Sequence, residues 1–174
     1  MAQNLATYAP DEVVVIISQP SSGVSTRVTG FMEDSFVSIA RDMDSWSHTT
    51  GADNLATRVY SANDSGKITL SVMQSSNSND VLTQIWSRDR SLKNSQGLFT
   101  ILVADKTGRS VYSSTEAYIG KIPDSVFGNG VNGREWVVHC TNLSHSIAGN
   151  SIVSPEVVEI LNKLGTDIAD EWKQ

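Results

Sequence analysis

Cysteine and long apolar runs are scarce in this chain, and each scarcity excludes a class of protein. The single cysteine, Cys140, has no partner for an internal disulfide. No run approaches the roughly 20 apolar residues of a membrane-spanning helix, and the first 12 residues lack the basic and then apolar pattern of a signal peptide. We therefore expect a cytoplasmic protein until another process moves it, with Cys140 buried as a small hydrophobic residue.

Positive charge is also scarce. The chain has 13 Lys and Arg residues against 19 Asp and Glu residues, which gives a formal net charge of −6. A basic groove for nucleic acid needs clustered Lys and Arg, so binding of this kind is not expected. A surface along which nucleic acid slides stays compatible with this charge.

The rest of the composition describes one β-rich domain. The 174 residues, 39% of them hydrophobic, suffice for about one domain with its own core. Many Ser, Thr, Asn and Gly residues favour strands joined by frequent turns.

No arrangement of catalytic or metal-binding residues is recognisable. Residues 128–133 read GNGVNG, the spacing of a dinucleotide-binding loop, but an extended segment follows them instead of a helix N-terminus. His139 and Cys140 are neighbours on an expected strand, so they face opposite sides and would not converge with His145 on one metal ion. We expect no catalytic residue, no cofactor and no metal, and we interpret GNGVNG as a glycine-rich hairpin turn.

The segment from Ser65 to Arg90 changes its hydrophobic period once. In its first half, apolar and polar residues alternate from residue 67 to residue 72, the pattern of a half-buried strand. Ser78 or Asn79 is the expected cap of the helix that follows. The apolar stripe of this helix comprises Val81, Leu82, Ile85, Trp86 and Leu92.

Apolar or alternating stretches elsewhere predict further strands, with a hairpin turn at residues 105–108. These stretches are Val13–Ile17, Phe31–Ile39, Leu98–Ala104, Ser110–Lys121 and Arg134–Leu143. The residues alone therefore predict mostly antiparallel strands with one helix.

Between Arg41 and Arg58 no hydrophobic period is sustained. Long loops inside compact domains are uncommon and tend to be functional. Met43, Trp46 and Leu55 are apolar in this otherwise polar segment and need a partner surface. We predict a contact arm, and the alternative is a longer hairpin with Trp46 packed into the core.

The last residues, 151–174, predict a helical extension of a domain that spans residues 1–150. Ser154, Pro155 and Glu156 supply a helix cap, a first-turn proline and a first-turn acid, while Gly165 and Thr166 are a candidate break. An apolar seam with spacings of four, three, four and four residues runs through Val157, Leu161, Leu164, Ile168 and Trp172. This apolar seam needs a surface to pack against, either on its own domain or on a neighbouring subunit.

Several segments, taken in order, resemble the tail tube proteins of bacteriophages, especially of contractile-tailed phages. They are TGADNLATR at the end of the loop, SGKITLSVMQSS before SNDVLTQIWSRD, STEAYIGKIPD, and GREW before the last strand. The resemblance implies a mainly β fold, an antiparallel β-sandwich or half-barrel with one flanking helix. It also implies hexameric rings that stack into a hollow tube through which DNA leaves the capsid. The extension at 151–174 departs from the family pattern.

The resemblance suggests roles for particular residues. The loop is expected to reach the next ring through Asp42, Met43, Trp46, His48 and Leu55. We expect the extension to contact a subunit through Val157, Leu161, Leu164, Ile168 and Trp172. Candidates for the channel wall are Lys67, Thr69, Ser71, Ser114 and Glu116. An acidic subunit suits such a wall, because like charge keeps DNA from adhering.

The implied partners are further copies of the chain, the tail sheath protein, and the terminator, baseplate and tape measure proteins. The protein would belong to a virion tail assembled in the host bacterial cytoplasm, with DNA passing through without sequence-specific binding. Two alternatives stay open. One is the tube of a related contractile injection particle, a tailocin. The other is a β-sandwich module that binds carbohydrate or a receptor through aromatic residues such as Trp46 and Trp172.

Overall fold

The computed structural model describes residues 5–174. Residues 1–4 lie outside this range. They belong to the expected 1–150 domain and to the segment for which no signal peptide is expected. The strands are β1 (Val13–Gln19), β2 (Val24–Val28), β3 (Val37–Arg41), β4 (Trp46–Thr50), β5 (Ala56–Tyr60), β6 (Gly66–Met73), β7 (Phe99–Asp105), β8 (Val111–Ile119), β9 (Gly133–Cys140) and β10 (Ser144–Ser146). The α-helices are α1 (Ser78–Leu92) and α2 (Pro155–Lys163), and short 3₁₀ turns lie at Pro10–Glu12, Pro20–Ser22, Ser95–Gly97 and Asp170–Trp172.

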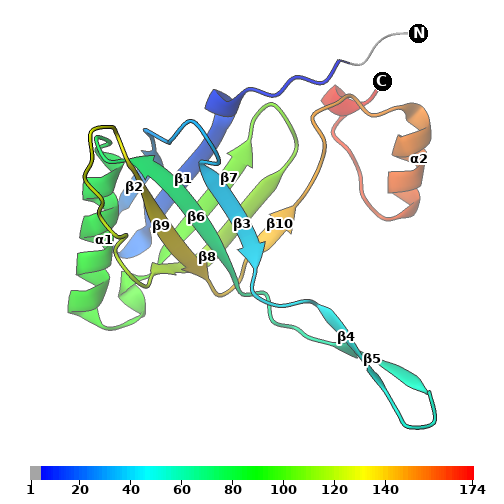
Figure 1. The fold of residues 1–174 in the computed structure, drawn as a ribbon. Helices are drawn as coiled ribbons and strands as arrows, with labels where there is room; N and C mark the ends of the chain where they lie inside the picture. Colours follow the sequence, from blue (N-terminus) through cyan, green and yellow to red (C-terminus); the bar gives the residue numbers. More distant parts are fainter. Residues whose placement is uncertain (1–4) are drawn as a thin grey trace.

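Eight strands form one open antiparallel sheet. Seven of them follow the order β2-β1-β7-β8-β9-β6-β3, and β10 pairs with β8 beside this path. The sheet curls so that β1 and β2 lie behind β6 and β9, with α1 along one side (Figure 1). The mainly β, antiparallel fold with a flanking helix is therefore confirmed, in its half-barrel form.

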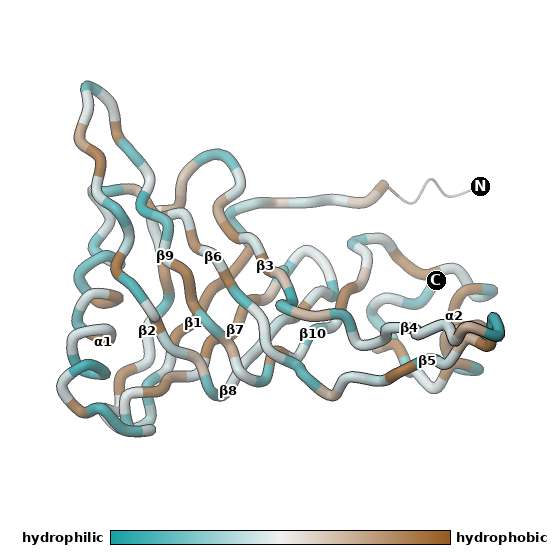
Figure 2. Tube along the Cα trace, turned by 60° about the horizontal axis from the view of Figure 1, so that its bottom comes forward, coloured by the Kyte–Doolittle hydropathy of each residue, from teal (hydrophilic) through white to brown (hydrophobic). Residues whose placement is uncertain are grey.

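The core fills the inner face of the curled sheet. Figure 2 shows hydrophobic segments along β1, β7 and β9, none of which is an edge strand of the sheet. Every second residue of β6 is buried, as its alternating sequence predicts. The buried cluster comprises Val15, Ile17, Val28, Ile68, Leu70, Val72, Leu82, Ile85, Phe99, Ile101, Val103, Ala117, Ile119, Trp136, Val138, Cys140 and Leu143.

Trp136 joins the helix to the sheet. Its side chain is only 2% exposed, and its indole Nε1–H donates to Asn79 Oδ1 at 2.9 Å. The Asn79 amide nitrogen in turn donates to the carbonyls of Met73 and Ser76. This chain of bonds satisfies the polar atoms that burial would otherwise leave unpaired, and it fixes the start of α1 over β9.

The cap of α1 differs from the prediction. Asn77 stands at the N-cap and makes no side-chain cap bond, whereas the Oγ of the preceding Ser76 accepts from the backbone N–H of Ser78 at 3.1 Å; neither Ser78 nor Asn79 is the cap. The hydroxyl of Ser78 instead binds the backbone of Thr29: it donates to the Thr29 carbonyl and accepts from the Thr29 N–H. These two bonds tie the first residue of α1 to the end of β2.

The expected strand over residues 31–39 is shorter than predicted. β3 begins only at Val37, and Phe31 forms an isolated bridge with Val72. Between them the rings of Phe31 and Phe36 lie 5.3 Å apart, which keeps the intervening turn against the core. Within residues 5–174, neither helix is long and apolar enough to cross a membrane.

Candidate assembly surfaces

Two segments leave the curled sheet: the β4–β5 hairpin, here called the arm, and the C-terminal extension with α2 (Figure 1). The arm follows β3 and returns into β6. All ten residues of β4 and β5 are exposed, and they pair from Trp46 opposite Tyr60 to Thr50 opposite Ala56. An isolated two-stranded hairpin is marginal in water, so this one needs internal stiffening or a partner.

The predicted arm is thus a hairpin, not a structureless loop. This corrects the expectation of no regular structure over residues 41–58. The alternative, a longer hairpin with Trp46 packed into the core, is right about the hairpin and wrong about Trp46, which is 48% exposed. Polar β-branched pairs such as Thr49 opposite Thr57 support strands without the apolar alternation that marks a strand on a core.

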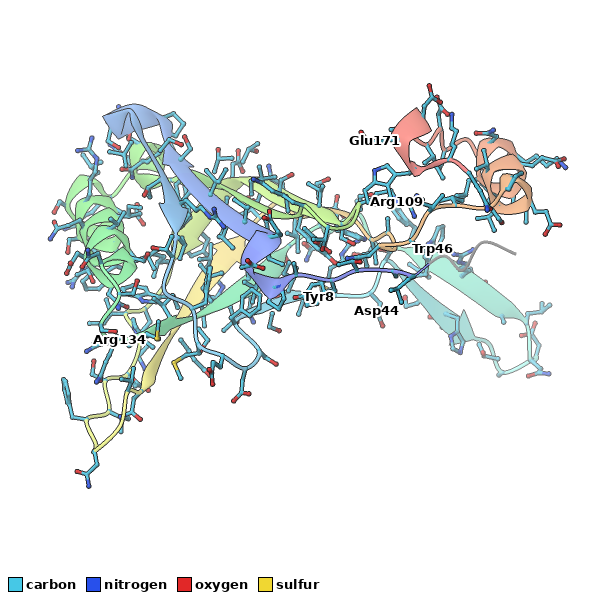
Figure 3. All side chains as sticks on the ribbon, turned by 90° about the horizontal axis from the view of Figure 1, so that it is seen from above. Tyr8, Asp44, Trp46, Arg109, Arg134 and Glu171 are labelled. Carbon is cyan, nitrogen blue, oxygen red and sulfur yellow. The ribbon has the colours of Figure 1, made fainter. Side chains whose placement is uncertain are left out.

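One face of the arm carries aromatic and cationic side chains. The Trp46 and Tyr60 rings lie 4.9 Å apart, and the Arg58 guanidinium carbon is 3.4 Å from the centre of the Trp46 ring. His48 is paired with Arg58 in the register and shares this face. These contacts stiffen the arm near its base, where Figure 3 shows Trp46.

Ion pairs and a hydrogen bond to a backbone carbonyl hold the neck of the arm, the residues on either side of the hairpin. Arg41 and Asp64, which flank the hairpin, form an ion pair at 2.5 Å, and Arg41 also donates to the carbonyl of Asn63. Asp42 pairs with Lys67 at 3.3 Å. The direction in which the arm leaves the sheet is therefore fixed at its base.

The five residues predicted to contact the next ring are spread along this arm. Asp42 and Met43 lie at the neck, where Met43 Sδ accepts from the Asn63 amide at 3.3 Å. Trp46 and His48 lie on β4, and Leu55, 70% exposed, lies near the tip. The structure brings Trp46 and His48 to one face of the arm, while Asp42 forms an ion pair with Lys67. The contact of these residues with the next ring stays a prediction.

Three of the predicted channel residues lie together on the outer face of β6. Lys67, Thr69 and Ser71 alternate with residues of the core. The register continues this face onto β9, where the opposite residues are His139, Val137 and Glu135. Glu116 of β8 is also exposed.

The placement of Ser114 on a polar, wet face is wrong, because its side chain is 1% exposed and its hydroxyl donates to Asn142 Oδ1 at 2.7 Å. The cause is a β-bulge that inserts one extra residue into β8 opposite β7. Ser114 and Ala117 both face the core as a result, and Thr115 and Glu116 both face outward. Asn142 Oδ1 accepts from the N–H groups of both outward residues, which holds the bulge.

The C-terminal seam is not one helix. α2 ends at Lys163, and Gly165 has a left-handed φ of 82°, a conformation that glycine adopts without strain. The predicted break is therefore confirmed. Of the five seam residues only Val157 and Leu161 lie in α2, while Ile168 is buried and Leu164 is 75% exposed.

The extension folds back on itself. The backbone of Val153 accepts from Gln174 and donates to Trp172, so the end of the chain returns to the start of the extension. Val153 and Ile168 are both 6% exposed, and neither belongs to the buried cluster of the half-barrel. The Arg109 guanidinium lies 5.4 Å from the Trp172 ring, and Figure 3 shows it beside the extension.

The linker before α2 is fastened to the β7–β8 turn by Asp105. The Asn150 amide donates to the Asp105 carboxylate at 2.9 Å, and Thr107 donates to it through both its hydroxyl and its N–H. Burial opposes ionisation of this carboxylate, but hydrogen bonds from Thr107, Asn150 and Gly108 outweigh it and hold the pKa of Asp105 below its ordinary value.

Asp105→Asn is expected to loosen this attachment with a defined pH dependence. Because the pKa of Asp105 is lowered in the folded state, its stabilisation is present above the unfolded-state pKa and is lost as the pH falls through the lower native pKa. We expect a loss of about 1 kcal/mol at neutral pH, since the partly solvated carboxylate has modest hydrogen bonds. Urea denaturation of both variants from about pH 2 to pH 7 measures the difference, which should vanish only at the acidic end. A constant difference across this range would contradict the assignment.

The loop between β8 and β9 is a surface that the sequence analysis missed. GNGVNG is not a tight hairpin turn but the end of a loop over residues 120–132. Arg134 stabilises the loop, with its guanidinium carbon 5.8 Å from the Phe127 ring and a hydrogen bond to Ser125. The exposed apolar residues in it are Ile122, Val126, Phe127 and Val131. Several apolar residues close together in a glycine-rich segment are the sequence feature that could have indicated this surface.

No group of three or more His, Cys, Asp and Glu residues within residues 5–174 is placed to hold a metal ion. His139 and Cys140 face opposite sides of β9, as expected: the His139 ring stacks on Tyr118 at 5.3 Å, and Cys140 is 2% exposed. Burial raises the pKa of the Cys140 thiol.

Comparison with known proteins gives three kinds of match. A family model described as the Bacteriophage PhiTE tail tube protein matches residues 5–148. The chain is 42% identical over 172 residues to "Structural protein ORF10" of Pseudomonas phage KPP10, covering 99% of each chain. The family match thus ends before α2, whereas the Pseudomonas phage relative is matched through the extension as well.

Solved structures share the fold at low sequence identity. A chain of the anti-feeding prophage cap, described as the tube terminating cap, aligns with a TM-score of 0.54 and 12% identity, over 85% of this chain and 98% of its own. A chain of the sheath–tube complex of the extracellular contractile injection system PVC aligns with a TM-score of 0.52 and 12% identity, over 80% and 91%. The sheath/tube terminator of that system gives 0.51 and 13%, over 82% and 99%.

Proposed function

Because the chain belongs to the family of the bacteriophage PhiTE tail tube protein, we propose that its copies close into hexameric rings. The rings would stack into the hollow tube of a contractile tail, through which DNA leaves the capsid. The chain is a structural component of a phage tail and not an enzyme. What we infer beyond this is the geometry of assembly.

The arm is the observation that carries the proposal. It exposes apolar and aromatic side chains on a hairpin whose base is held by the Arg41–Asp64 ion pair. A long, solvated hairpin is costly for a free monomer, because it gains little burial for the residues that it orders. Its exposure is accounted for if the arm packs on the next ring through Met43, Trp46, His48 and Leu55.

The outer face of β6 and β9 is our candidate for the channel wall. Lys67, the cation among the predicted wall residues of β6, is paired with Asp42, which reduces its attraction for phosphate. Glu135 and the exposed Glu116 add negative charge on β9 and β8. At physiological salt the Debye length is about 8 Å, so these charges would act on DNA only close to the wall. A net charge of −6 per subunit is consistent with DNA that passes without adhering.

The contractile character and the remaining partners extend the same proposal. The fold is that of chains from a contractile injection system, one of them described in a sheath–tube complex. We infer that a sheath surrounds the tube, that terminator, baseplate and tape measure proteins meet it, and that assembly takes place in the host bacterial cytoplasm. A phage tail is favoured over a tailocin, because the relative that is 42% identical belongs to a phage.

The alternative of a carbohydrate-binding module has little support in the structure. Each of its two candidate aromatic residues has an arginine over the ring, Arg58 at 3.4 Å from the centre of Trp46 and Arg109 at 5.4 Å from that of Trp172. A sugar platform needs an open aromatic face, so these side chains are poorly placed for that role.

Electron microscopy of the purified full-length chain tests the proposal. We expect six-fold rings or tubes of uniform bore, either spontaneously or after an initiator complex from the tail tip is added. Glycan-array binding by the same preparation serves as the comparison for the alternative function. A chain that stays monomeric at high concentration with the initiator present would overturn the ring and tube proposal.

A further inference from the structure

α2 presents an apolar face that the rest of its own subunit leaves open. Val157 and Ile160 of α2, with Leu164 directly after it, recur at spacings of three and four residues and are 43%, 55% and 75% exposed. Glu156 and Lys163 lie at the two ends of this stripe, and Lys163 also pairs with Glu159 in α2 at 2.7 Å. The other side of the helix, with Leu161, is partly buried, so the open stripe keeps Val157 and Leu164 of the predicted seam and has Ile160 in place of Leu161.

A mainly apolar groove lies between α1 and the turn from β1 into the edge strand β2, and we call it the α1–β2 groove. Its volume is about 500 Å³. Asp80 and Arg88 stand on the rim, both exposed, near the two ends of the groove along α1. The other lining residues are Gln19, Ser22, Val24, Val81, Gln84 and Ile85.

The charges of the two surfaces match in one orientation only. Glu156 and Lys163 are seven residues apart, about 10 Å along a helix, and Asp80 and Arg88 are eight apart, about 12 Å. If α2 lies antiparallel to α1, Glu156 meets Arg88 and Lys163 meets Asp80. A parallel arrangement would oppose like charges at both ends, which disfavours it.

The two surfaces lie at opposite ends of the subunit. Figures 1 and 2 both show α1 at one end and α2 at the other, with the sheet between them. α2 therefore does not reach the groove of its own subunit. Complementary surfaces at opposite ends make a head-to-tail contact, the kind that closes copies into a ring.

We propose that α2 of each subunit docks antiparallel to α1 in the α1–β2 groove of a neighbouring copy in the same ring. The inference rests on the proposed ring assembly and adds to it a clasp outside the family-wide fold. Ile160 would occupy the groove, while the ion pairs Glu156–Arg88 and Lys163–Asp80 would set the direction.

Charge reversal in the full-length chain tests the pairing. Arg88→Glu and Glu156→Lys alone should each raise the protein concentration needed for tube growth about tenfold, because each opposes like charges at the contact. The double variant should restore growth close to that of the wild type. Lys106→Glu, which reverses an exposed charge on the β7–β8 turn outside both surfaces, is the matched control and should change little. Single variants that assemble like the wild type, or a double variant that rescues nothing, would overturn the proposal.

Cysteine cross-linking tests the contact without altering charge. In a Gln84→Cys, Ile160→Cys variant, oxidation should give a ladder of covalent oligomers that ends at the hexamer, because the native Cys140 is buried and does not compete. Arg90→Cys with Ile160→Cys is the control, since residue 90 lies about 120° around α1 from residue 84. If tubes form but no ladder appears, the proposed clasp is refuted while the proposed function stands, and another partner such as the sheath would occupy the groove. A ladder of covalent oligomers larger than the hexamer contradicts a contact within one ring. Failure of the wild type to form rings would instead refute the proposed function.

Discussion

Replacement of the arm, Trp46–Tyr60, by a two-residue Asn-Gly turn is expected to abolish tube growth while leaving a folded subunit. The arm contributes nothing to the buried cluster, so its removal costs the half-barrel little. The N–H of Ser61 donates to the carbonyl of Ser45 at 2.9 Å, which means that a tight turn can join these two residues without moving the neck.

Circular dichroism and thermal unfolding should show a subunit like the wild type, with a change in free energy of unfolding below about 1 kcal/mol. Electron microscopy should show isolated rings or monomers and no tubes. Thr49→Ser together with Thr57→Ser, on the face of the arm opposite Trp46, is the matched control that keeps the hairpin. Tubes of normal length from the shortened chain would show that the arm does not join rings.

Substitution of Trp136 by alanine should destabilise the subunit by about 3–5 kcal/mol, a large part of the stability of a domain of this size. The change removes the largest fully buried side chain and leaves a cavity between α1 and β9. It also leaves Asn79 Oδ1 without its donor in the interior, which adds the cost of an unpaired polar atom. Urea denaturation of the unassembled subunit measures the loss.

Trp136→Phe separates the two contributions. It keeps most of the apolar volume but removes the indole donor, so we expect a loss of about 1–3 kcal/mol. Trp86→Ala, on the apolar stripe of α1 but only partly buried, should lose less than Trp136→Ala. An alanine variant at 136 within 1 kcal/mol of the wild type would mean that this contact does not hold α1 to the sheet.

Local pattern predicted the elements that pack on the core. β6 and α1 were identified because burial on one face leaves a period of two in a strand and of three to four in a helix. The same reasoning placed Cys140 in the core and His139 outside it. It failed for β4 and β5, because a solvated hairpin has no buried face and hence no apolar period.

The assignment of individual wall and contact residues shows the same limit. Alternation along β8 placed Ser114 with Glu116, but one extra residue at the bulge turned Ser114 into the core. The bulge depends on Asn142, which is 28 residues away from Ser114 in the chain. The pattern of neighbouring residues along β8 therefore could not predict the bulge. The exposed stripe of α2 likewise moved from Leu161 to Ile160, because the extension packs its other side on itself.

The sequence by itself determined the fold class, the absence of an internal disulfide, the acidic charge and the resemblance to tail tube proteins, because these follow from composition and from patterns between near neighbours. Only the tertiary structure decided how the arm leaves the sheet, which polar residues face outward, and that α2 and the α1–β2 groove lie at opposite ends of the subunit. Each of these depends on contacts between residues far apart in the chain, and such contacts leave no period in the sequence.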